Sequence, residues 1–317
     1  MSFKNILITG GAGFIGTFLS KKLIKSGFNV TILDKKQTQV DTFSSIKVNI
    51  EDFGELKKIN KSFDLVIHLA AEHQDNIKPI SRYYDVNVEG TKNIINFCNL
   101  KNIKNIIFFS TQAIYGNDKE RYSEDSSPNP SNDYGKSKYL AEKLLLDWKK
   151  ENYKLGIIRP SAVFGNGSIG NFSRLIEQIK SKKFIMIGDG ENIKSVCYVK
   201  NLIAYVLHSM KVMESQDLLV TNYADKPDIT INQLVFYIRS ILNLKGSKIK
   251  IPYSIAMFFG YIFDFLSFIS NTPINITSLR IKKFCLNSIL ESNVIASTGF
   301  TPTFSFREAL EDNLKEY

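Results

Sequence analysis

Short apolar runs alternate with stretches of helical periodicity through the first half of the chain. The apolar runs lie at about 4–8, 29–33, 46–50, 63–68, 105–109 and 154–158. Segments from about 52, at 81–100 and at 132–151 have apolar residues at helical spacing. Near-continuous apolar strands that alternate with helices predict an α/β fold, a doubly wound parallel sheet covered on both faces.

The alternation loosens after about residue 165. We expect a helix at 172–182 and a strand at 184–187, then a helix at 199–213 and a strand at 218–222 that returns to the main sheet. The domain prediction that follows is a large domain over 1–165, to which 199–225 returns, and a smaller α/β substrate-binding lobe made of 166–198 and 226–317.

The stretch 251–269 approaches a membrane span in length and is almost wholly apolar. Asp264 and Gly260 within it, and Pro252 at its start, favour a largely buried helix instead. We therefore expect no stable membrane insertion, while contact with a membrane interface stays open.

Composition adds limits on location and partners. The 317 residues are 44% apolar, and the net charge of +10 comes from Lys and Arg spread along the chain. That distribution argues against a nucleic-acid partner and is compatible with an anionic substrate. The three cysteines and three histidines have no metal-ligand spacing, so no metal is expected. Reduced thiols and a first strand that begins within three residues, leaving no room for a signal peptide, predict a cytoplasmic location.

The segment 9–16, TGGAGFIG, joins the first predicted strand to the first helix. Gly10 would permit the tight turn, Gly13 would let a pyrophosphate approach the helix N-terminus, and Gly16 would let helix and strand pack closely. Asp34 ends the second strand, 24 residues after Gly10, where a carboxylate can accept ribose hydroxyls. The pattern predicts a Rossmann-type domain that binds NAD rather than NADP, although the two lysines that follow Asp34 soften this preference.

Candidate chemistry lies at the start of the long helix. Tyr134 and Lys138 are four residues apart, so their side chains share a helix face. An ammonium beside the phenol would lower the tyrosine pKa toward a range in which it exchanges a proton with a sugar hydroxyl. Ser110 and Thr111 follow a predicted strand, where a hydroxyl could share the substrate oxygen. Thr111, Tyr134 and Lys138 are thus the predicted catalytic residues.

With these residues the chain resembles the extended short-chain dehydrogenases/reductases that act on nucleotide sugars, over nearly its whole length. The motifs that carry the resemblance are the three glycines and Asp34, HLAA at 68–71, NVEGT at 87–91, STQAIYG at 110–116, Glu124 with Pro128, YGKSK at 134–138, Arg159-Pro160 and GDG at 188–190. The resemblance implies that 1–165 binds NAD and that a homodimer forms through helices 81–100 and 132–151.

The same resemblance implies individual site residues. The cofactor contacts are Gly10, Gly13, Phe14, Ile15, Gly16, Asp34, Asn49, Ile50, Leu69, Ala70, Ala71, Asn87, Ser110, Tyr134, Lys138 and Pro160. The substrate contacts are Thr111, Tyr134, Asn171 and Lys194. Lys194 stands where an arginine is usual, so the charge is kept and the bidentate fork is lost.

Gln112 and Ala113 stand where dehydratases of this family place an acidic pair, which the elimination of water requires. Without that pair, the expected chemistry is hydride transfer at a sugar carbon without loss of water. We predict an NAD-dependent 4-epimerase of a UDP-hexose or UDP-N-acetylhexosamine that works through a 4-keto intermediate. Open alternatives are an NAD(P)H-dependent 4-ketosugar reductase in surface-polysaccharide synthesis, a steroid or flavonoid ketone reductase, and an NAD-sensing protein without chemistry.

Overall fold

The computed structural model describes residues 3–36, 44–74, 77–168, 170–245, 249–270 and 277–315, without the side chain of Asn171. Its contacts divide the chain into two units. Unit 1 comprises Met1–Ser161, Cys197–Ala224 and Leu290–Thr303. Unit 2 comprises Ala162–Val196, Asp225–Ile289 and Phe304–Tyr317.

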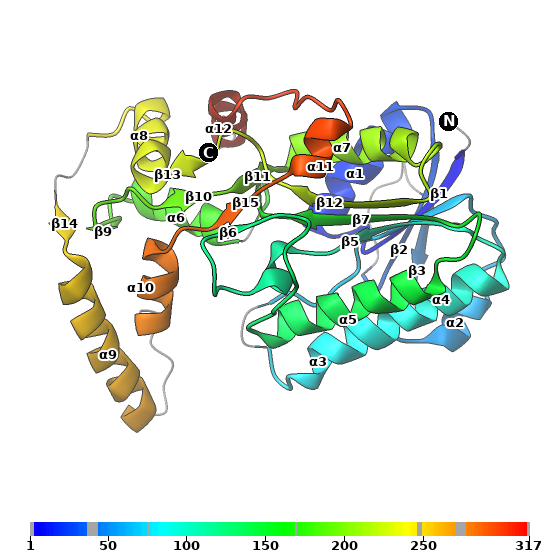
Figure 1. Cartoon of the computed structure of the whole chain (residues 1–317), viewed down its shortest axis with the longest axis horizontal. Coiled ribbons are helices and arrows are strands. Elements are labelled where there is room, and N and C mark those ends of the chain that lie inside the picture. Colours follow the sequence, from blue (N-terminus) through cyan, green and yellow to red (C-terminus); the bar gives the residue numbers. More distant parts are fainter. Residues whose placement is uncertain are drawn as a thin grey trace. The chain divides into compact units, whose positions relative to one another are not determined.

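Unit 1 contains a parallel sheet, which has seven strands within the described residues (Figure 1). The strands are β1 (Asn5–Thr9), β2 (Asn29–Asp34), β3 (Ser44–Lys47), β4 (Leu65–His68), β5 (Asn105–Phe109), β7 (Lys154–Pro160) and β12 (Leu218–Tyr223). Their order is β12-β7-β5-β4-β1-β2-β3, so the chain moves outward from β1 and then returns to its other side with β4. The predicted doubly wound sheet, including the return of β12, is confirmed.

The order of strands also locates the binding edge. Because the strand order reverses between β1 and β4, their carboxyl ends lie next to each other, with Thr9 paired to His68. Doubly wound sheets bind ligands at such a switch point, since the loops that leave the two strands diverge there. The glycine turn and the segment 69–71 both leave the sheet at this place.

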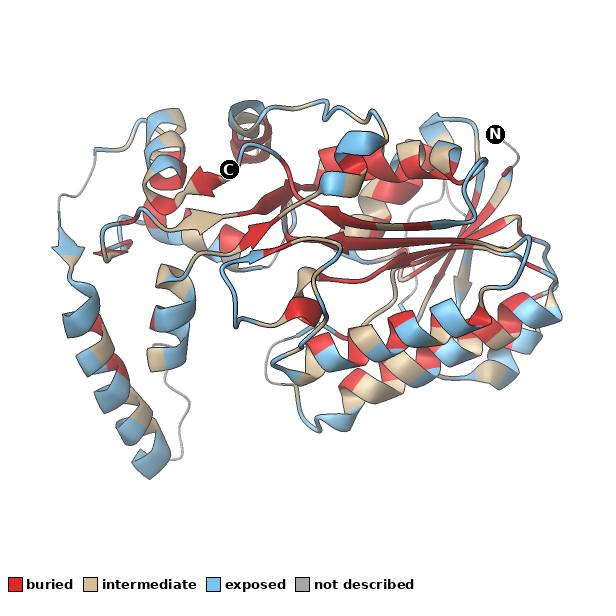
Figure 2. Cartoon of the chain, in the orientation of Figure 1, coloured by how far each residue is buried: buried red, intermediate tan, exposed pale blue. Residues whose placement is uncertain are grey.

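Helices cover both faces of this sheet (Figure 1). On one face α1 (Phe14–Lys25) packs against α7 (Val199–Val212). On the other lie α2 (Phe53–Lys57), α4 (Gly90–Leu100) and α5 (Asp133–Trp148), preceded by α3 (Ser81–Tyr84). The central strands between them are buried (Figure 2). The expected helix at 81–100 is interrupted by a π-helical segment, Asp85–Glu89, a feature that is common at functional sites.

Smaller elements complete unit 1. They are a 3-10 turn (Gln112–Tyr115), β6 (Arg121–Tyr122) and α11 (Asn293–Ser297). Residues 290–303 group with unit 1, which differs from the expected assignment of 226–317 to the second lobe. The reason is a set of hydrogen bonds: the Glu291 amide donates to the Tyr122 carbonyl at 2.7 Å, and the Glu124 carboxylate accepts from the amides of Asn293 and Val294.

Unit 2 is built from short strands and helices around aromatic contacts. Its elements are β8 (Ala162–Phe164), α6 (Asn171–Lys180), β9 (Met186–Ile187), β10 (Ile193–Lys194), β13 (Ile229–Thr230), α8 (Ile231–Ile241), β14 (Lys250–Ile251), α9 (Tyr253–Ser270), α10 (Ser278–Cys285) and α12 (Phe306–Leu314). Two strands, β11 (Val196–Tyr198) and β15 (Ile289–Leu290), fall on the boundaries between the units. Phe164 stacks on Phe172 with ring centroids 4.2 Å apart, and Phe306 meets the edge of Phe164.

The expectation that 251–269 forms a largely buried helix is wrong. The segment is helical as α9, but among its residues the structure buries only Ala256 and Gly260 (Figure 2). Its length and mean hydropathy of 1.4 are sufficient for a membrane span, and 11% of it is buried. Small residues, rather than the aromatic ones, face the protein.

Candidate active site

The glycine turn lies between the end of β1 and the start of α1. Gly10 has a φ of +70°, and a Cβ there would lie 2.6 Å from the Ala70 nitrogen, so the turn runs against the segment after β4. Gly13 is the N-cap of α1 and provides no side-chain cap. The first-turn amides, including those of Phe14 and Ile15, therefore have no intrahelical acceptor. This is the geometry that binds a phosphate at a helix N-terminus.

Asp34 lies beside this turn at the end of β2. Its carboxylate accepts a hydrogen bond from the Ala12 amide at 3.1 Å and another from the Lys36 amide at 2.9 Å. After β3, the Asn49 side chain donates to Glu51 at 2.9 Å, and the Ile50 carbonyl accepts from the side chain of Asn93. The structure thus holds the Asp34 carboxylate against the glycine turn, where the sequence predicts an acceptor for ribose hydroxyls.

A buried histidine ties the ends of β1 and β4 to the π-helical segment. The Thr91 hydroxyl donates to the Asn87 carbonyl at 2.6 Å, so it accepts from His68 Nε2 at 3.0 Å. His68 Nδ1 is then left to accept from the Thr9 hydroxyl at 2.6 Å, and Thr9 Oγ1 accepts from the Ala70 amide at 3.3 Å. This chain of hydrogen bonds fixes the backbone of the predicted cofactor segment 69–71.

The pKa of His68 predicts a pH-dependent stability. Burial, reinforced by the charge of Lys138, lowers the pKa of His68 from 6.5 to about 3. Below pH 6.5 the unfolded chain therefore binds a proton that the folded chain excludes, and stability falls as the pH falls. We expect the free energy of unfolding to drop by about 2 kcal/mol between pH 6.5 and about pH 5. Urea titrations should show this slope, and His68→Asn should flatten it. If the wild type and His68→Asn lose stability equally as the pH falls, the effect does not come from His68.

The start of α5 is pressed against the loop that carries Thr111. Asn132 caps the helix by accepting from the Gly135 amide at 2.7 Å. A Cβ on Gly135 would lie 2.4 Å from the Ala113 carbonyl oxygen, so glycine is needed for the close approach. Thr111 accepts from the Ala113 amide at 3.2 Å and hydrogen-bonds the hydroxyl of Tyr134. The structure thus brings together Thr111 and Tyr134, as the sequence predicts.

The pKa of Tyr134 differs from expectation. Burial raises it to about 12, the hydrogen bond from Thr111 lowers it by less, and the nearby Tyr83 raises it further. The expected lowering by Lys138 is therefore wrong for this structure, because desolvation of the phenolate is the larger effect. Thr111 is the described group that favours the phenolate.

Lys138 lies one turn after Tyr134 and is 1% exposed. Its ammonium sits 4.0 Å from the centroid of the Phe108 ring. Burial lowers its pKa to about 7, and the carboxylate of Glu142 opposes that shift. The amine can therefore gain or lose a proton near neutral pH, which few side chains other than histidine do.

Behind Lys138 lies a buried ion pair that the sequence analysis did not identify. Glu142 and Arg159 form two hydrogen bonds, 3.0 and 2.7 Å long, with side chains 1% and 8% exposed. Arg159 also donates to the Tyr115 hydroxyl at 2.8 Å, which in turn donates to Asn222. The available signal was an arginine within an otherwise apolar strand.

The remaining predicted cofactor residues border the same edge. Asn87 donates to the Ser137 hydroxyl at 2.9 Å and thereby joins the π-helical segment to α5. The Ser110 hydroxyl, at the end of β5, is buried and has no hydrogen-bond partner within the described residues. Pro160 ends β7 beside β5 in the sheet. An unmatched hydroxyl, a bare glycine turn and a carboxylate along one sheet edge fit a bound dinucleotide.

The predicted substrate residues Asn171 and Lys194 belong to unit 2. Asn171 is the first residue of α6, and its side chain lies outside the described residues. Lys194 donates from Nζ to the carbonyls of Lys283 and Leu286, at 2.9 and 2.5 Å, at the end of α10. Burial lowers the Lys194 pKa to about 8. The roles of both residues toward substrate stay predictions.

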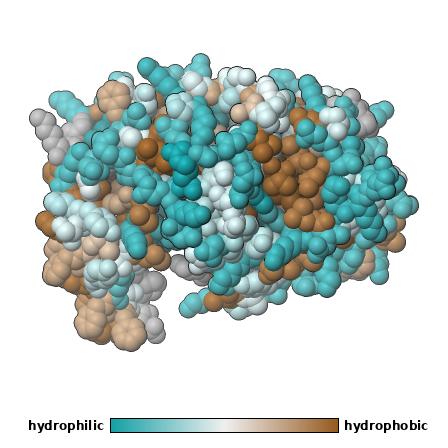
Figure 3. All heavy atoms as spheres, viewed as in Figure 1, coloured by the Kyte–Doolittle hydropathy of each residue, from teal (hydrophilic) through white to brown (hydrophobic). Residues whose placement is uncertain are grey.

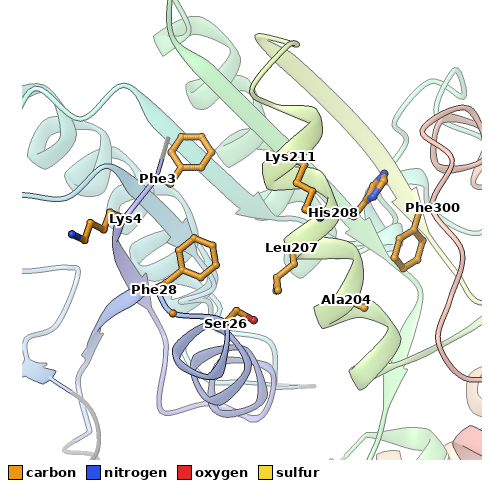
Figure 4. A pocket seen from close by; sticks show the side chains of 10 residues that line it. Phe3, Lys4, Ser26, Phe28, Ala204, Leu207, His208, Lys211 and Phe300 are labelled. Atoms are coloured by element: carbon orange, nitrogen blue, oxygen red, sulfur yellow. The ribbon is translucent and has the colours of Figure 1, made fainter. Parts of the chain in front are cut away.

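A surface pocket in unit 1 lies at the opposite edge of the sheet. Figure 4 shows Phe3 and Phe28, which precede β1 and β2, facing Leu207 and Lys211 of α7. The glycine turn and Thr111 follow the carboxyl ends of their strands, whereas this pocket borders the amino ends. It is therefore separate from the predicted reacting centre.

Fold and site together define an enzyme of the dinucleotide-binding, short-chain dehydrogenase class. The profile of the NAD dependent epimerase/dehydratase family matches residues 6–220. The chain belongs to this family, so the predicted family and the predicted cofactor NAD are confirmed.

Known proteins are similar to this chain over most of its length. The N-acetyl-alpha-D-glucosaminyl-diphospho-ditrans,octacis-undecaprenol 4-epimerase of Escherichia coli O157:H7 is 38% identical over 98% of this chain and 94% of its own length. The UDP-glucose 4-epimerase of Lactobacillus helveticus is 33% identical over 66% of this chain and 74% of its own. The solved UDP-glucose 4-epimerase of Thermotoga maritima, in complex with UDP-glucose, has a TM-score of 0.79 at 25% identity and covers 98% of this chain and 97% of its own.

Proposed function

We propose that this protein epimerises C4 of a diphosphate-linked N-acetylglucosamine, with the polyprenol-linked sugar as its preferred substrate. The observation that carries the proposal is the 38% identity to a 4-epimerase of undecaprenyl-diphosphate-linked N-acetylglucosamine, which extends over 98% of the chain. The presence of Thr111, Tyr134 and Lys138 on adjoining elements supports catalysis over a purely regulatory role.

The residues of this chain would position the cofactor and the sugar and would transfer the hydroxyl proton. The amides at the start of α1 would hold the pyrophosphate of NAD and the Asp34 carboxylate its adenosine ribose. When bound, NAD would supply the removal of hydrogen from C4 and its return. Tyr134 would take the proton of the C4 hydroxyl and give it back, helped by the hydrogen bond from Thr111. Lys138, on the same helix face, would contact the cofactor, as the family resemblance implies.

Gln112 and Ala113 support epimerisation over dehydration, because neither side chain can act as the acid or base that loss of water requires. The 4-ketosugar reductase predicted as an alternative would use the same three catalytic residues. It differs in consuming reduced cofactor with every turnover, so the two reactions are separated by cofactor balance rather than by geometry.

A UDP-linked sugar is the second candidate substrate. It is supported by the Lactobacillus relative and by a solved UDP-N-acetylglucosamine 4-epimerase of Methanobrevibacter ruminantium, 25% identical with a TM-score of 0.76. In both candidates the sugar is attached through a diphosphate, the group that the resemblance assigns to Lys194. The candidates therefore differ only beyond the diphosphate.

A single assay tests these alternatives. Purified protein with its retained NAD, and no added cofactor, is given N-acetylglucosaminyl-diphospho-undecaprenol or UDP-N-acetylglucosamine in detergent. We expect the N-acetylgalactosamine epimer from the first substrate at the higher kcat/KM. Turnover of the UDP-sugar alone supports the second candidate. NADH oxidation with a nucleotide 4-ketosugar, and no epimer from either sugar, supports the reductase and rejects epimerisation.

We also infer a cytoplasmic homodimer, paired through the helices at 81–100 and 132–151. The support is the family resemblance, together with exposed Leu140 and Leu146 on α5 and Leu100 on α4. The molar mass of the purified protein in solution tests the pairing.

A further inference from the structure

Helix α9 is amphipathic, but its small and polar side faces the protein and its apolar side faces outward. Ala256, Gly260 and Asp264 recur at four-residue spacing and share one side of the helix. A Cβ on Gly260 would lie 2.9 Å from both Ser278 Cα and Ile281 Cδ1, so α10 packs directly on this side. Asp264 accepts a hydrogen bond from the Ser278 hydroxyl at 2.5 Å. The carboxylate of α9, its one charged side chain, is therefore already bound by α10.

The opposite side of α9 is an apolar stripe that faces solvent. Phe258, Ile262, Phe265 and Ile269 follow the i, i+4, i+7, i+11 spacing of one helix face, and they are 63%, 36%, 63% and 64% exposed. Phe268 beside them is 85% exposed. Figure 3 shows apolar side chains gathered over this helix. We call these five residues the α9 stripe.

The charges within the segment that carries α9 and α10 are almost all positive. Between residues 241 and 290 there is one acidic residue, Asp264, which α10 already binds. The same segment contains six cationic residues, Lys245, Lys248, Lys250, Arg280, Lys282 and Lys283. Lys282 and Lys283 are exposed on α10. An aromatic stripe flanked by lysine and arginine is the composition of helices that lie in a lipid interface.

We propose that unit 2 docks on an anionic membrane surface, with the α9 stripe among the acyl chains and the cations of α10 at the lipid headgroups. A full span fits less well, because α10 covers one side of α9 and Asp264 lies within the helix. A second copy of the chain fits less well too, since pairing through α9 would bring two sets of cations together.

This inference rests on the proposed function in one respect. A polyprenol-linked sugar is anchored in a membrane, so an enzyme for it must work at the lipid surface. The structure supplies a connection within unit 2, because the carbonyls of Lys283 and Leu286 at the end of α10 accept from Lys194. The docking helices and the lysine that the resemblance places at the diphosphate thus belong to one hydrogen-bonded block.

The test is co-sedimentation of the full-length protein with vesicles of phosphatidylcholine, alone or mixed with phosphatidylglycerol. We expect the protein to pellet with the mixed vesicles and much less with phosphatidylcholine alone. The double variant Phe258→Asp/Phe265→Asp should lose at least about ten-fold in vesicle affinity. The matched control is Phe236→Asp on α8, which changes an equally exposed phenylalanine (67%) and should bind like the wild type. Lys282→Glu/Lys283→Glu should remove only the preference for the anionic lipid.

Two outcomes would overturn the proposal. One is no pelleting of the wild type with either vesicle. The other is a molar mass that halves in the double variant, which would assign the stripe to a second copy of the chain. Epimerisation of detergent-dispersed substrate is measured on the same variants. If the wild type turns over the sugar but does not bind vesicles, the docking is refuted and the proposed function stands. If the wild type binds vesicles but turns over neither sugar, the docking stands and the proposed function is refuted.

Discussion

Tyr134→Phe is expected to lower kcat for C4 epimerisation by a factor of about 10²–10⁴, the usual contribution of a positioned proton-transfer group. The phenol is the hydroxyl that Thr111 hydrogen-bonds at the start of α5. Retained NAD should stay at the wild-type level, because the ring and its packing against Tyr83 remain. Initial rates and the cofactor content of the purified protein measure the two effects.

Tyr139→Phe is the matched control, since it removes a phenol hydroxyl from the next turn of the same helix, where the ring lies under Lys143. We expect its kcat to stay within about two-fold of the wild type. Equal kcat for Tyr134→Phe and Tyr139→Phe would show that Tyr134 does not transfer the hydroxyl proton.

Glu142→Gln is expected to reduce the free energy of unfolding by about 3–5 kcal/mol, the typical cost of breaking one side of a buried ion pair. The Arg159 guanidinium cannot lose its charge, and its side chain is 8% exposed, so it would stay buried without a counter-charge. The same change should lower the pKa of Lys138 further below about 7, because Glu142 is the group that raises it. Urea denaturation measures the first effect.

The exposed pair Arg307–Glu311, with an N–O distance of 2.9 Å, provides the control. Glu311→Gln should cost less than about 1 kcal/mol, since water screens both partners. A loss for Glu142→Gln no larger than that of Glu311→Gln would mean that the internal pair does not hold α5 to β7.

The sequence predicts the architecture of unit 1 well because its signals are local. Apolar runs between helices specify the parallel strands, and the glycine turn with Asp34 specifies the binding edge. The predicted element boundaries were less accurate. The apolar run 46–50 predicted the third strand, but β3 is Ser44–Lys47, because its pairing with β2 decides which residues form the strand. The division of 226–317 between two units depends on long-range hydrogen bonds of Glu124, which no local pattern reveals.

The candidate active site contains features that local sequence patterns do not predict. The spacing of Tyr134 and Lys138 predicts a shared helix face, but their pKa values depend on burial, which raises one and lowers the other. The partnership of Glu142 with Arg159 joins a helix and a strand, so the arginine in the apolar strand signals a buried partner but does not identify it. Asp264, Gly260 and Pro252 within an apolar stretch suggested burial of α9, whereas in the structure the small residues at 256 and 260 mark the side that packs.

The most direct test of the central claim is the fate of a deuterium label at C4 of the sugar. The claim is that one hydrogen leaves C4 and returns to the same carbon, inside one protein, with Tyr134 handling only the hydroxyl proton. Incubation of N-acetyl[4-²H]glucosaminyl-diphospho-undecaprenol with the purified protein, without added NADH, should give an epimer that keeps its deuterium. Loss of the label to water, or an absolute need for added NADH, would contradict the claim.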